Sequence, residues 1–223
     1  MNRRNFIKST AAITAAIFLP VKLNAGKIID LTALKVTEYK KKIIFIIEAL
    51  KREGSNLVLK IMNGKEYVFN PYTHYPFDGG IKDEESGYRL FFHAHRENEY
   101  GHFHTFAKNE DGELIHLILI SMNKIGEPIG LATVNGWVTG DKYENSDTLK
   151  KLADSFYINP KLYEDEKTIQ FINYIFKAYS NEINELFILR DKWIADYVSK
   201  NFREPFEDRE FEILSYKEIT NLL

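Results

Sequence analysis

The chain has 223 residues, of which 44% are hydrophobic and 28% are charged, a composition typical of globular proteins with a substantial core. Its formal charge of −2 leaves no basic surplus to neutralise phosphates, which argues against a nucleic-acid-binding protein. There is no cysteine, so disulfides, thiolate ligands, a cysteine nucleophile and a lipidated N-terminal cysteine are excluded. Any metal site must therefore use histidine, carboxylates, other oxygen donors, methionine or water.

Residues 1–25 are predicted to be a signal peptide of the twin-arginine type. The adjacent Arg3 and Arg4, with Phe6 and Lys8 at the following positions, resemble the twin-arginine motif. A weakly apolar run, residues 11–19, precedes a possible cleavage point after Ala25. This run is too short to cross a bilayer, which needs about 20 apolar residues. The alternative is a basic amphipathic first helix of a cytoplasmic protein.

The predicted signal leads to expectations about location and partners. We expect export to the periplasm by the twin-arginine machinery, cleavage near Ala25 and no stable membrane span. Cleavage would remove four basic residues and no acidic one, which leaves 26 basic and 32 acidic residues and a formal charge of −6. Because this pathway carries folded proteins, many of them loaded with a metal or cofactor, the signal favours a bound metal.

The first part of the mature chain is predicted to hold a helix, a hairpin and a loop. Apolar residues recur near a 3.6-residue period over about residues 30–53, which predicts a helix that stops at Gly54. Residues 57–62 and 66–69 flank Asn63-Gly64, a dipeptide typical of a type I′ turn, and are expected to form a β-hairpin. Residues 70–87, rich in Pro, Gly, Asp and aromatics, are expected to form an irregular loop.

The rest of the chain is predicted to be a strand meander followed by helices. Strands are expected at residues 88–95, 102–107, 114–122 and 129–139, helices at 146–156, 166–180 and 181–201, and a short last strand at 211–216. Short connections between sequential strands favour antiparallel pairing. Residues 26–223 are therefore predicted to form one α+β domain, with an N-terminal helix, a mainly antiparallel sheet of about six strands and a C-terminal helical layer.

Four of the six histidines lie within twelve residues, on two predicted strands. Side chains at i and i+2 of a strand share a face, so His93 and His95 point the same way, as do His102 and His104. If residues 96–101 close a hairpin, His95 is expected opposite His102 and His93 opposite His104. The four imidazoles would then occupy one patch.

This patch is predicted to bind a divalent transition metal ion. Four protonated imidazoles would repel one another, whereas a metal ion takes neutral imidazole nitrogens. Without thiolates, His93, His95, His102 and His104 suit Zn, Fe, Cu, Ni or Mn. Glu99 and Arg96 lie at the mouth of the patch and are candidates for a catalytic role, Glu99 as a proton carrier or further ligand.

Other interpretations of the same residues stay open. A metal-free catalytic or ligand-binding pocket and a purely structural hydrogen-bonding cluster both fit the pattern. Gly87, His93, His95 and Glu99 have the spacing of the first half of the cupin metal motif, although Phe106 replaces its last glycine and no second motif follows. A cupin-like β-barrel with added helices is therefore the alternative architecture.

Several other polar residues are weaker candidates. His74 and Asp78 are in the loop that could cover the patch, and His116 is most simply a strand histidine. Four residues at a strand end face a pocket or only make turn hydrogen bonds; they are Asn135, Trp137, Thr139 and Asp141. The pair Arg190-Asp191 is most simply an ion pair or a helix-surface feature. The chain has no Gly-rich phosphate loop, nucleophile elbow or His-Glu-x-x-His helix, which argues against nucleotide-dependent, classical hydrolase and zincin functions.

The histidine segment resembles the motif of a bacterial family known only as a domain of unknown function. That motif reads aromatic-aromatic-His-x-His-Arg and then Gly-His-Phe-His-x-Phe, as in residues 91–96 and 101–106. The likeness extends over most of residues 70–215, through the segments 74–76, 116–117, 135–141 and 190–191. Gly136 replaces a basic residue of the family pattern and Asp141 replaces a glutamate. The resemblance implies no particular activity.

Three functions fit these observations. The first is an exported metalloenzyme with oxidative or hydrolytic activity. The second is a metal-binding or sensing module without turnover. The third is a metal-free protein that binds a small anionic or aromatic molecule. Three ligands and a water would favour the first, whereas a closed four-ligand site would favour the second.

Overall fold

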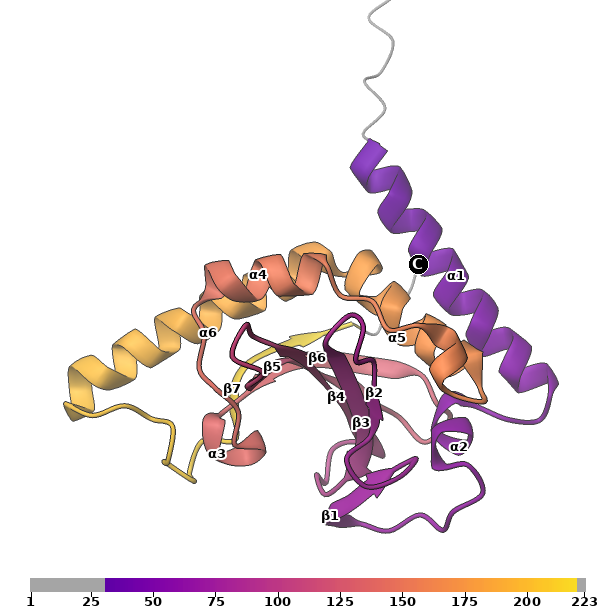
Figure 1. Ribbon diagram of the computed structural model, residues 1–223, viewed down its shortest axis with the longest axis horizontal. Coiled ribbons are helices and arrows are strands. Elements are labelled where there is room, and N and C mark those ends of the chain that lie inside the picture. The colour runs from indigo at the N-terminus through magenta and orange to yellow at the C-terminus, as the bar shows by residue number, and fades with distance from the viewer. Residues whose placement is uncertain (1–30, 220–223) are drawn as a thin grey trace, which may run out of the picture. The chain divides into compact units, whose positions relative to one another are not determined.

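The computed structural model describes residues 31–219. They form one antiparallel sheet with helices packed on one of its faces (Figure 1). The predicted signal peptide, residues 1–25, and its boundary with the domain lie outside the described residues. The described residues belong to a single compact unit. Within them, no helix combines the length and apolarity needed to cross a membrane.

Within residues 31–219, two helices precede the sheet. Helix α1, Leu31–Arg52, confirms the predicted first helix, and Gly54 follows it in the left-handed conformation. The predicted hairpin around Asn63-Gly64 is wrong, because Leu57–Met62 form helix α2. Asn56 caps the start of α2 by accepting a hydrogen bond from the Leu59 amide, and Asn63 ends it in the left-handed conformation. The left-handed preference of Asn-Gly, which we assigned to a turn, here ends a helix.

The described part of the chain contributes seven strands to the sheet, all paired antiparallel. Its order is β1-β3-β4-β5-β6-β7, and the short β2 also pairs with β3. The strands are β1 Asn70–Tyr75, β2 Ile81–Lys82, β3 Tyr88–Ala94, β4 Gly101–Lys108, β5 Leu114–Met122, β6 Pro128–Val134 and β7 Ile213–Glu218. The edge strands β1 and β7 are not paired with each other, so the sheet is open and the cupin-like barrel is wrong.

Two strand predictions need correction. The expected loop 70–87 contains β1 and β2, which extend the sheet beside β3. The predicted strand 129–139 stops at Val134, because Asn135 turns the chain into the short helix α3, Gly136–Thr139. The Asn135 side chain accepts from the Gly136 amide, and Gly140 closes the helix with positive φ. The other predicted strands are confirmed.

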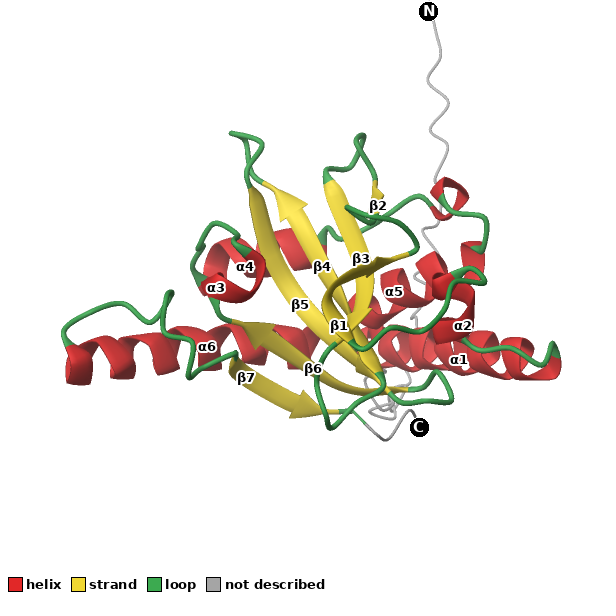
Figure 2. Ribbon diagram, turned by 90° about the horizontal axis from the view of Figure 1, so that it is seen from below, coloured by secondary structure: helices red, strands yellow, loops and turns green. Residues whose placement is uncertain are grey.

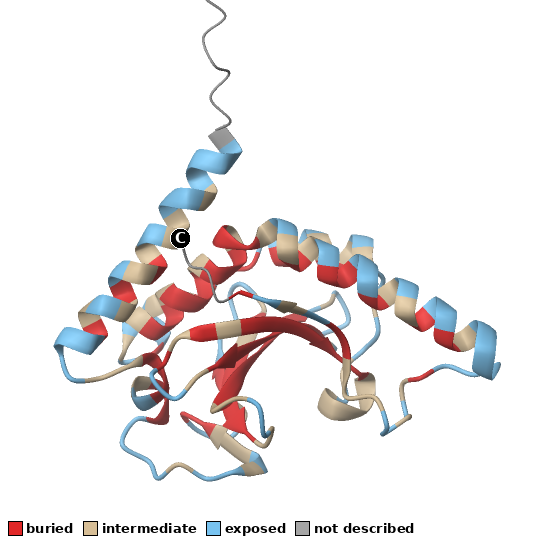
Figure 3. Ribbon diagram, turned by 180° about the vertical axis from the view of Figure 1, so that it is seen from behind, coloured by how far each residue is buried: buried red, intermediate tan, exposed pale blue. Residues whose placement is uncertain are grey.

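The helices of the C-terminal half cover one face of the sheet, as predicted (Figure 2). They are α4 Ser146–Asp154, the 3-10 turn η1 Pro160–Leu162, α5 Glu166–Ala178 and α6 Ser180–Asn201. Helix α5 directs Ile169, Ile172 and Phe176 into the main core, where Phe92 of β3 and Phe103 of β4 are also fully buried. Figure 3 shows this pattern, with the buried side of the helices turned toward the sheet.

The opposite face of the sheet carries the histidines. Phe92 and Phe103 face the helices, so their strand neighbours His93, His102 and His104 point to the other side. A small apolar cluster of Leu119, Ala132 and Val134 occupies the same side. The sheet thus has one apolar face, which the helices cover, and an opposite face, which carries the histidines.

Candidate metal centre

Strands β3 and β4 bring the histidines together, as period two predicts, but in a different register. His93 pairs with His102, and Phe91 pairs with His104. The pairing is shifted by two residues from the one we predicted, which placed His93 opposite His104. A two-residue shift keeps the same side chains on the same face, whereas a one-residue shift would have reversed them. The shared face is confirmed and the predicted pairs are wrong.

The connection between the strands, residues 95–100, lies one residue earlier than the predicted connection, residues 96–101. β3 ends at Ala94 and β4 begins at Gly101, so His95 lies in the connection and has no partner on β4. Tyr100 is held by its backbone amide, which donates to Met122 O at 2.9 Å, and by its ring, which stacks on Tyr67. These two contacts lie next to β4, at the end of the connection. His95 is half-buried at its start, while His93, His102 and His104 are buried.

The four rings form one contiguous cluster. The His93 ring centroid lies 4.4 Å from that of His102 and 4.8 Å from those of His95 and His104. The His102 centroid lies 5.0 Å from that of His95 and 4.8 Å from that of His104. His93 and His102 are thus the centre of the cluster, with His95 toward the strand connection and His104 further along β4.

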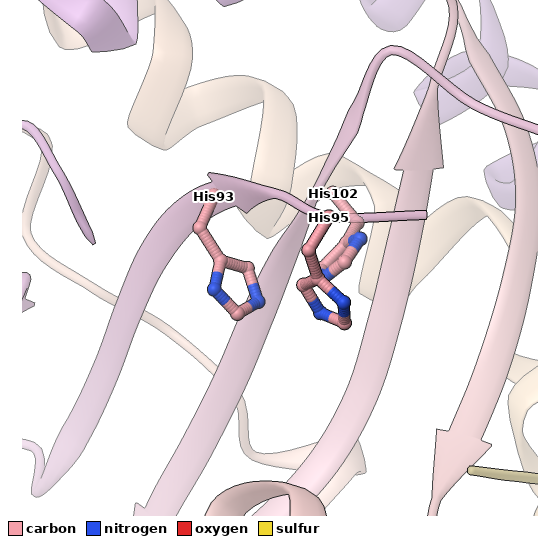
Figure 4. Close-up of side chains that lie close together, drawn as sticks. All are labelled: His93, His95 and His102. Carbon is pink, nitrogen blue, oxygen red and sulfur yellow. The ribbon is translucent and has the colours of Figure 1, made fainter. Parts of the chain in front are cut away.

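Three of the histidines can present nitrogens to a single ion. One ligand atom each from His93, His95 and His102 lies within 4.8 Å of the others. Figure 4 shows these three side chains extending to the same side of the sheet. His104, the fourth predicted ligand, is not part of this three-residue group. Its ring nevertheless contacts the rings of both His93 and His102.

Each buried imidazole of the cluster has a hydrogen-bond partner at Nδ1 and none at Nε2. His93 Nδ1 donates to the carbonyl oxygen of Pro71 at 3.2 Å, and His102 Nδ1 donates to Glu99 Oε1. His104 Nδ1 lies 2.9 Å from His116 Nε2. The Nε2 atoms of His93, His102 and His104 are buried without a partner. Metal-binding histidines show this arrangement, in which an outer partner at one nitrogen orients the other toward the ion.

Burial keeps these imidazoles neutral. It lowers the pKa of His93 to about 2, with further lowering by His102 and His95. Burial also lowers the pKa of His102 and His104 well below the usual histidine value, and that of His116 to about 3. A neutral imidazole has the lone pair that a metal requires.

Glu99 and Arg96, our catalytic candidates, lie beside the histidines in a polar chain. The Glu99 side chain is only 4% exposed, and its two oxygens contact His102 Nδ1 and Arg96 Nη1. Arg96 Nε also lies 3.4 Å from Glu212 Oε1. Burial raises the pKa of Glu99, while Ser121 and Arg96 lower it. In this position Glu99 orients His102.

A cleft of about 640 Å³ opens beside the cluster. Its lining includes His95, Arg96 and Glu99 from the strand connection, together with residues of three other strands and a loop: Ser121, Ile129, Glu212, Ile213 and Tyr216. Tyr216 and Glu212 were not among our sequence candidates, because their place in the cleft depends on β7 pairing with β6. The cleft gives a small molecule access to the His95 side of the cluster.

The weaker sequence candidates have structural partners. Asn135 is fully buried, and its Nδ2 donates to backbone oxygens of Pro205, Asp208 and Phe211. Trp137 Nε1 also donates to Phe211 O. Arg190 pairs with Asp191, whose Oδ2 accepts from the Ser146 amide at the start of α4.

His74 and His116 lie nearer to the cluster. His74 packs on Phe91 and contacts the His93 ring, and its Nδ1 is 3.5 Å from Asp78 Oδ1. His116 touches His104, while its backbone amide donates to Asp141 Oδ2. Asp141 also accepts from the Thr139 hydroxyl. The sequence indicates an ordinary strand residue at His116, whereas in the structure its ring lies against that of His104.

Comparison with known proteins places this site in an uncharacterised family. A family model described as a domain of unknown function, DUF6969, matches residues 37–219, which include the whole sheet and every histidine. The chain therefore belongs to this family, in agreement with the resemblance of its histidine segment. No curated protein and no solved structure matches the chain.

Proposed function

We propose that this DUF6969 protein binds a divalent transition metal ion with His93, His95 and His102. The observation that carries the proposal is the set of buried, unpartnered Nε2 atoms on His93, His102 and His104. A buried polar atom without a partner costs about 1–3 kcal/mol. Two of these atoms, on His93 and His102, are on proposed ligands whose rings are oriented through Nδ1, and an ion that accepts their lone pairs would account for both.

Charge supports the same proposal. The cleft and the cluster together hold the carboxylates of Glu97, Glu99 and Glu212, and Arg96 is the one cation among their lining residues. With neutral histidines this gives a formal charge of −2, which a divalent cation balances. The donor set is imidazole with carboxylate nearby and no thiolate, which suits Zn, Fe, Cu, Ni or Mn.

The cleft favours an enzyme over a closed metal-binding module. Catalytic metal sites have about three protein ligands and an open position for water or substrate, while structural sites are closed. His95 belongs to the three-histidine group and also lines the cleft, so the open position would face it. Arg96 and Tyr216 would then contact a bound molecule, and the reaction would be hydrolytic or oxidative.

Elemental analysis of the purified protein tests metal binding. We expect one ion per chain in the wild type and its loss in His93→Ala and His102→Ala. His74→Ala is the matched control, because His74 contacts His93 but lies outside the three-residue group. Absence of metal after loading with each of the five candidate ions would refute the proposal. Full occupancy in either ligand variant would remove that residue as an essential ligand.

A metal-free binding protein is the second candidate function. It is favoured by the size of the cleft and by Arg96, which has a 24% exposed side chain and could bind an anionic group. In that case, small carboxylic acids would bind the metal-free wild type and bind Arg96→Gln more weakly. Binding that appears only after metal loading would favour the metalloprotein instead.

We further propose export through the twin-arginine pathway, supported by Arg3, Arg4 and the apolar run that follows. Fractionation of cells that express the full chain tests this. The wild type is expected in the periplasm without residues 1–25, and a variant with Arg3→Lys and Arg4→Lys is expected to stay uncleaved in the cytoplasm. Equal distribution of the two proteins would contradict the proposal.

A further inference from the structure

His116 lies outside the four-histidine motif but contacts its innermost member. Its Nε2 lies 2.9 Å from His104 Nδ1, the ring centroids are 5.0 Å apart, and both side chains are buried. One of these two nitrogens must carry the shared proton, and which one does so decides what His104 Nε2 can bind. A proton on Nδ1 leaves a lone pair on Nε2, whereas a proton on Nε2 blocks it.

An irregularity in β5 brings His116 to this position. Along β5, Ser121 pairs with His102 and Leu119 pairs with His104. Regular alternation would next place Leu117 on this face, opposite Phe106. The register shifts instead, so that His116 pairs with Phe106 while Leu117 and Ile118 both enter the main core. Irregularities of this kind re-aim side chains and are frequent near functional sites.

The two neighbouring histidines show which proton arrangement the cluster uses. The Pro71 carbonyl can only accept a hydrogen bond, so His93 must carry its proton on Nδ1. The Glu99 carboxylate accepts in the same way from His102. In both rings Nε2 therefore carries no proton, and its lone pair is directed into the cluster. His104 has the same geometry, with Nδ1 partnered and Nε2 buried and free.

We propose that His116 is a positioning residue that accepts the Nδ1 proton of His104 and so presents His104 Nε2 to the ion as a further histidine nitrogen. This inference rests on the proposed metal site and adds His104 to its ligands. His116 is itself held in place, because its backbone amide donates to Asp141 Oδ2 at 2.9 Å and its ring packs edge-on against Phe106. Neither of its ring nitrogens is among the buried atoms without a partner.

Nitrogen-15 NMR of the metal-free protein tests the proton position directly. Long-range correlations within each imidazole distinguish the two tautomers. We expect the Nδ1-protonated form for His104 in the wild type and in His116→Gln, because the glutamine amide oxygen can still accept. In His116→Leu the acceptor is gone, and we expect the Nε2-protonated form to appear. An Nε2-protonated His104 in the wild type, or an unchanged tautomer in His116→Leu, would overturn the inference.

Metal affinity provides the second measurement. Loss of an outer partner lowers the affinity of a histidine site about 10–100-fold, so we expect a loss of that order for Zn²⁺ in His116→Leu and a smaller loss in His116→Gln. With Co²⁺, His116→Leu should also change the visible spectrum, because the ligand set changes. Phe106→Leu is the matched control, since Phe106 packs on both rings and makes neither hydrogen bond.

The outcomes separate the two proposals. If the wild type binds Zn²⁺ and His116→Leu binds it equally well with the same Co²⁺ spectrum, the inference fails and the metal site stands. An equal loss in Phe106→Leu and His116→Leu would show that packing is responsible and would also overturn the inference. A wild type that binds neither Co²⁺ nor any of the five candidate ions would refute both proposals.

Discussion

His93 on β3 and His102 on β4 are a directly opposed pair, with ring centroids 4.4 Å apart and ring planes at 87°. Two of the three candidate ligands therefore come from adjacent positions of a sheet whose opposite face is packed against helices. Sites built on such rigid elements hold their geometry without a ligand present. The proposed centre should consequently exist in the metal-free protein, and its affinity should depend on the residues that orient each ring.

Glu99 is the first of these residues to test. Its carboxylate contacts His102 Nδ1 and is almost fully buried. We expect Glu99→Ala to lower Zn²⁺ affinity about 10–100-fold, the usual effect of removing such a partner, and Glu99→Gln to lower it less, because an amide oxygen still accepts. Competition with a zinc chelator measures both. Glu97→Gln is the control for the loss of one negative charge, since Glu97 is exposed in the same cleft. Unchanged affinity in Glu99→Ala would mean that His102 needs no orientation.

Acid should destabilise the metal-free protein over an unusually wide pH range. His93 has a folded pKa of about 2 and His116 one of about 3, while an unfolded histidine titrates near 6.5. Between these values the unfolded state binds more protons, so stability is complete above pH 6.5 and falls as the pH decreases. Each such histidine contributes up to about 1.4 kcal/mol per pH unit within this window. Glu99 and Asp141, whose pKa values are raised, act in the opposite direction.

Urea unfolding at several pH values between 7.5 and 5 checks this expectation. His93→Gln should show a weaker pH dependence than the wild type, because a titrating group has been removed. A wild-type stability that is constant over this range would show that the buried histidines are hydrated in the metal-free protein. Bound metal should raise the stability at every pH in this range without changing the slope, because the folded rings are already neutral before the ion binds.

Gly101 is required where β4 begins, directly before His102. A Cβ at this position would lie 2.3 Å from Phe92 Cζ and 2.9 Å from the His93 carbonyl oxygen. Phe92 is fully buried and the carbonyl is backbone, so neither can move freely. We expect Gly101→Ala to destabilise the fold by about 1–3 kcal/mol, the usual effect of overpacking, and to weaken metal binding by separating His93 from His102. Thermal unfolding and metal titration measure the two effects.

Gly136→Ala is the matched control for Gly101→Ala. Gly136 also lacks a positive φ, and the atoms nearest to its added Cβ would lie at 3.5 Å or more. This variant should be as stable as the wild type. Equal destabilisation by the two substitutions would show that the effect comes from the loss of glycine rather than from contact at the histidine pair.

The shared face of the histidines could be predicted from the sequence, whereas the residues that pair with them across the strands and accept their hydrogen bonds could not. Period two places His102 and His104 on one side, and His93 joins them in the predicted register and in the observed one, because the two differ by an even number of residues. The register itself depends on Tyr100, which is held by Met122 and Tyr67, residues far from it in the sequence. The hydrogen bond from His93 to the Pro71 carbonyl has no sequence signature, because any residue can supply a backbone carbonyl.

The sequence before Asn63-Gly64 contains a feature that favours the observed helix over the predicted hairpin. Both residues favour left-handed conformations, which suit a type I′ turn and the end of a helix alike. The preceding residues decide between the two. Leu57, Val58, Ile61 and Met62 are the buried positions of α2, and a spacing of four between Leu57 and Ile61 is helical. His116 had no comparable signal, since its face depends on the irregularity in β5.

Asn135 holds the segment that forms one wall of the cleft, and its replacement gives the last prediction. Its side-chain amide is fully buried and donates to Pro205 O at 2.9 Å, Phe211 O at 3.0 Å and Asp208 O at 3.3 Å, while its backbone amide donates to Glu212 O. Asn135→Ala removes all three of these side-chain hydrogen bonds, so we expect a loss of about 1–3 kcal/mol. Asn135→Asp should cost more, because a carboxylate would face several carbonyl oxygens. Urea unfolding gives both values, and hydrogen exchange should show faster exchange in residues 205–212.

The control is Asn145→Ala, which removes an exposed helix cap and should cost about 0.5–2 kcal/mol without changing exchange in residues 205–212. If Asn135→Asp proved as stable as the wild type, the buried amide would not be what joins this segment to β6.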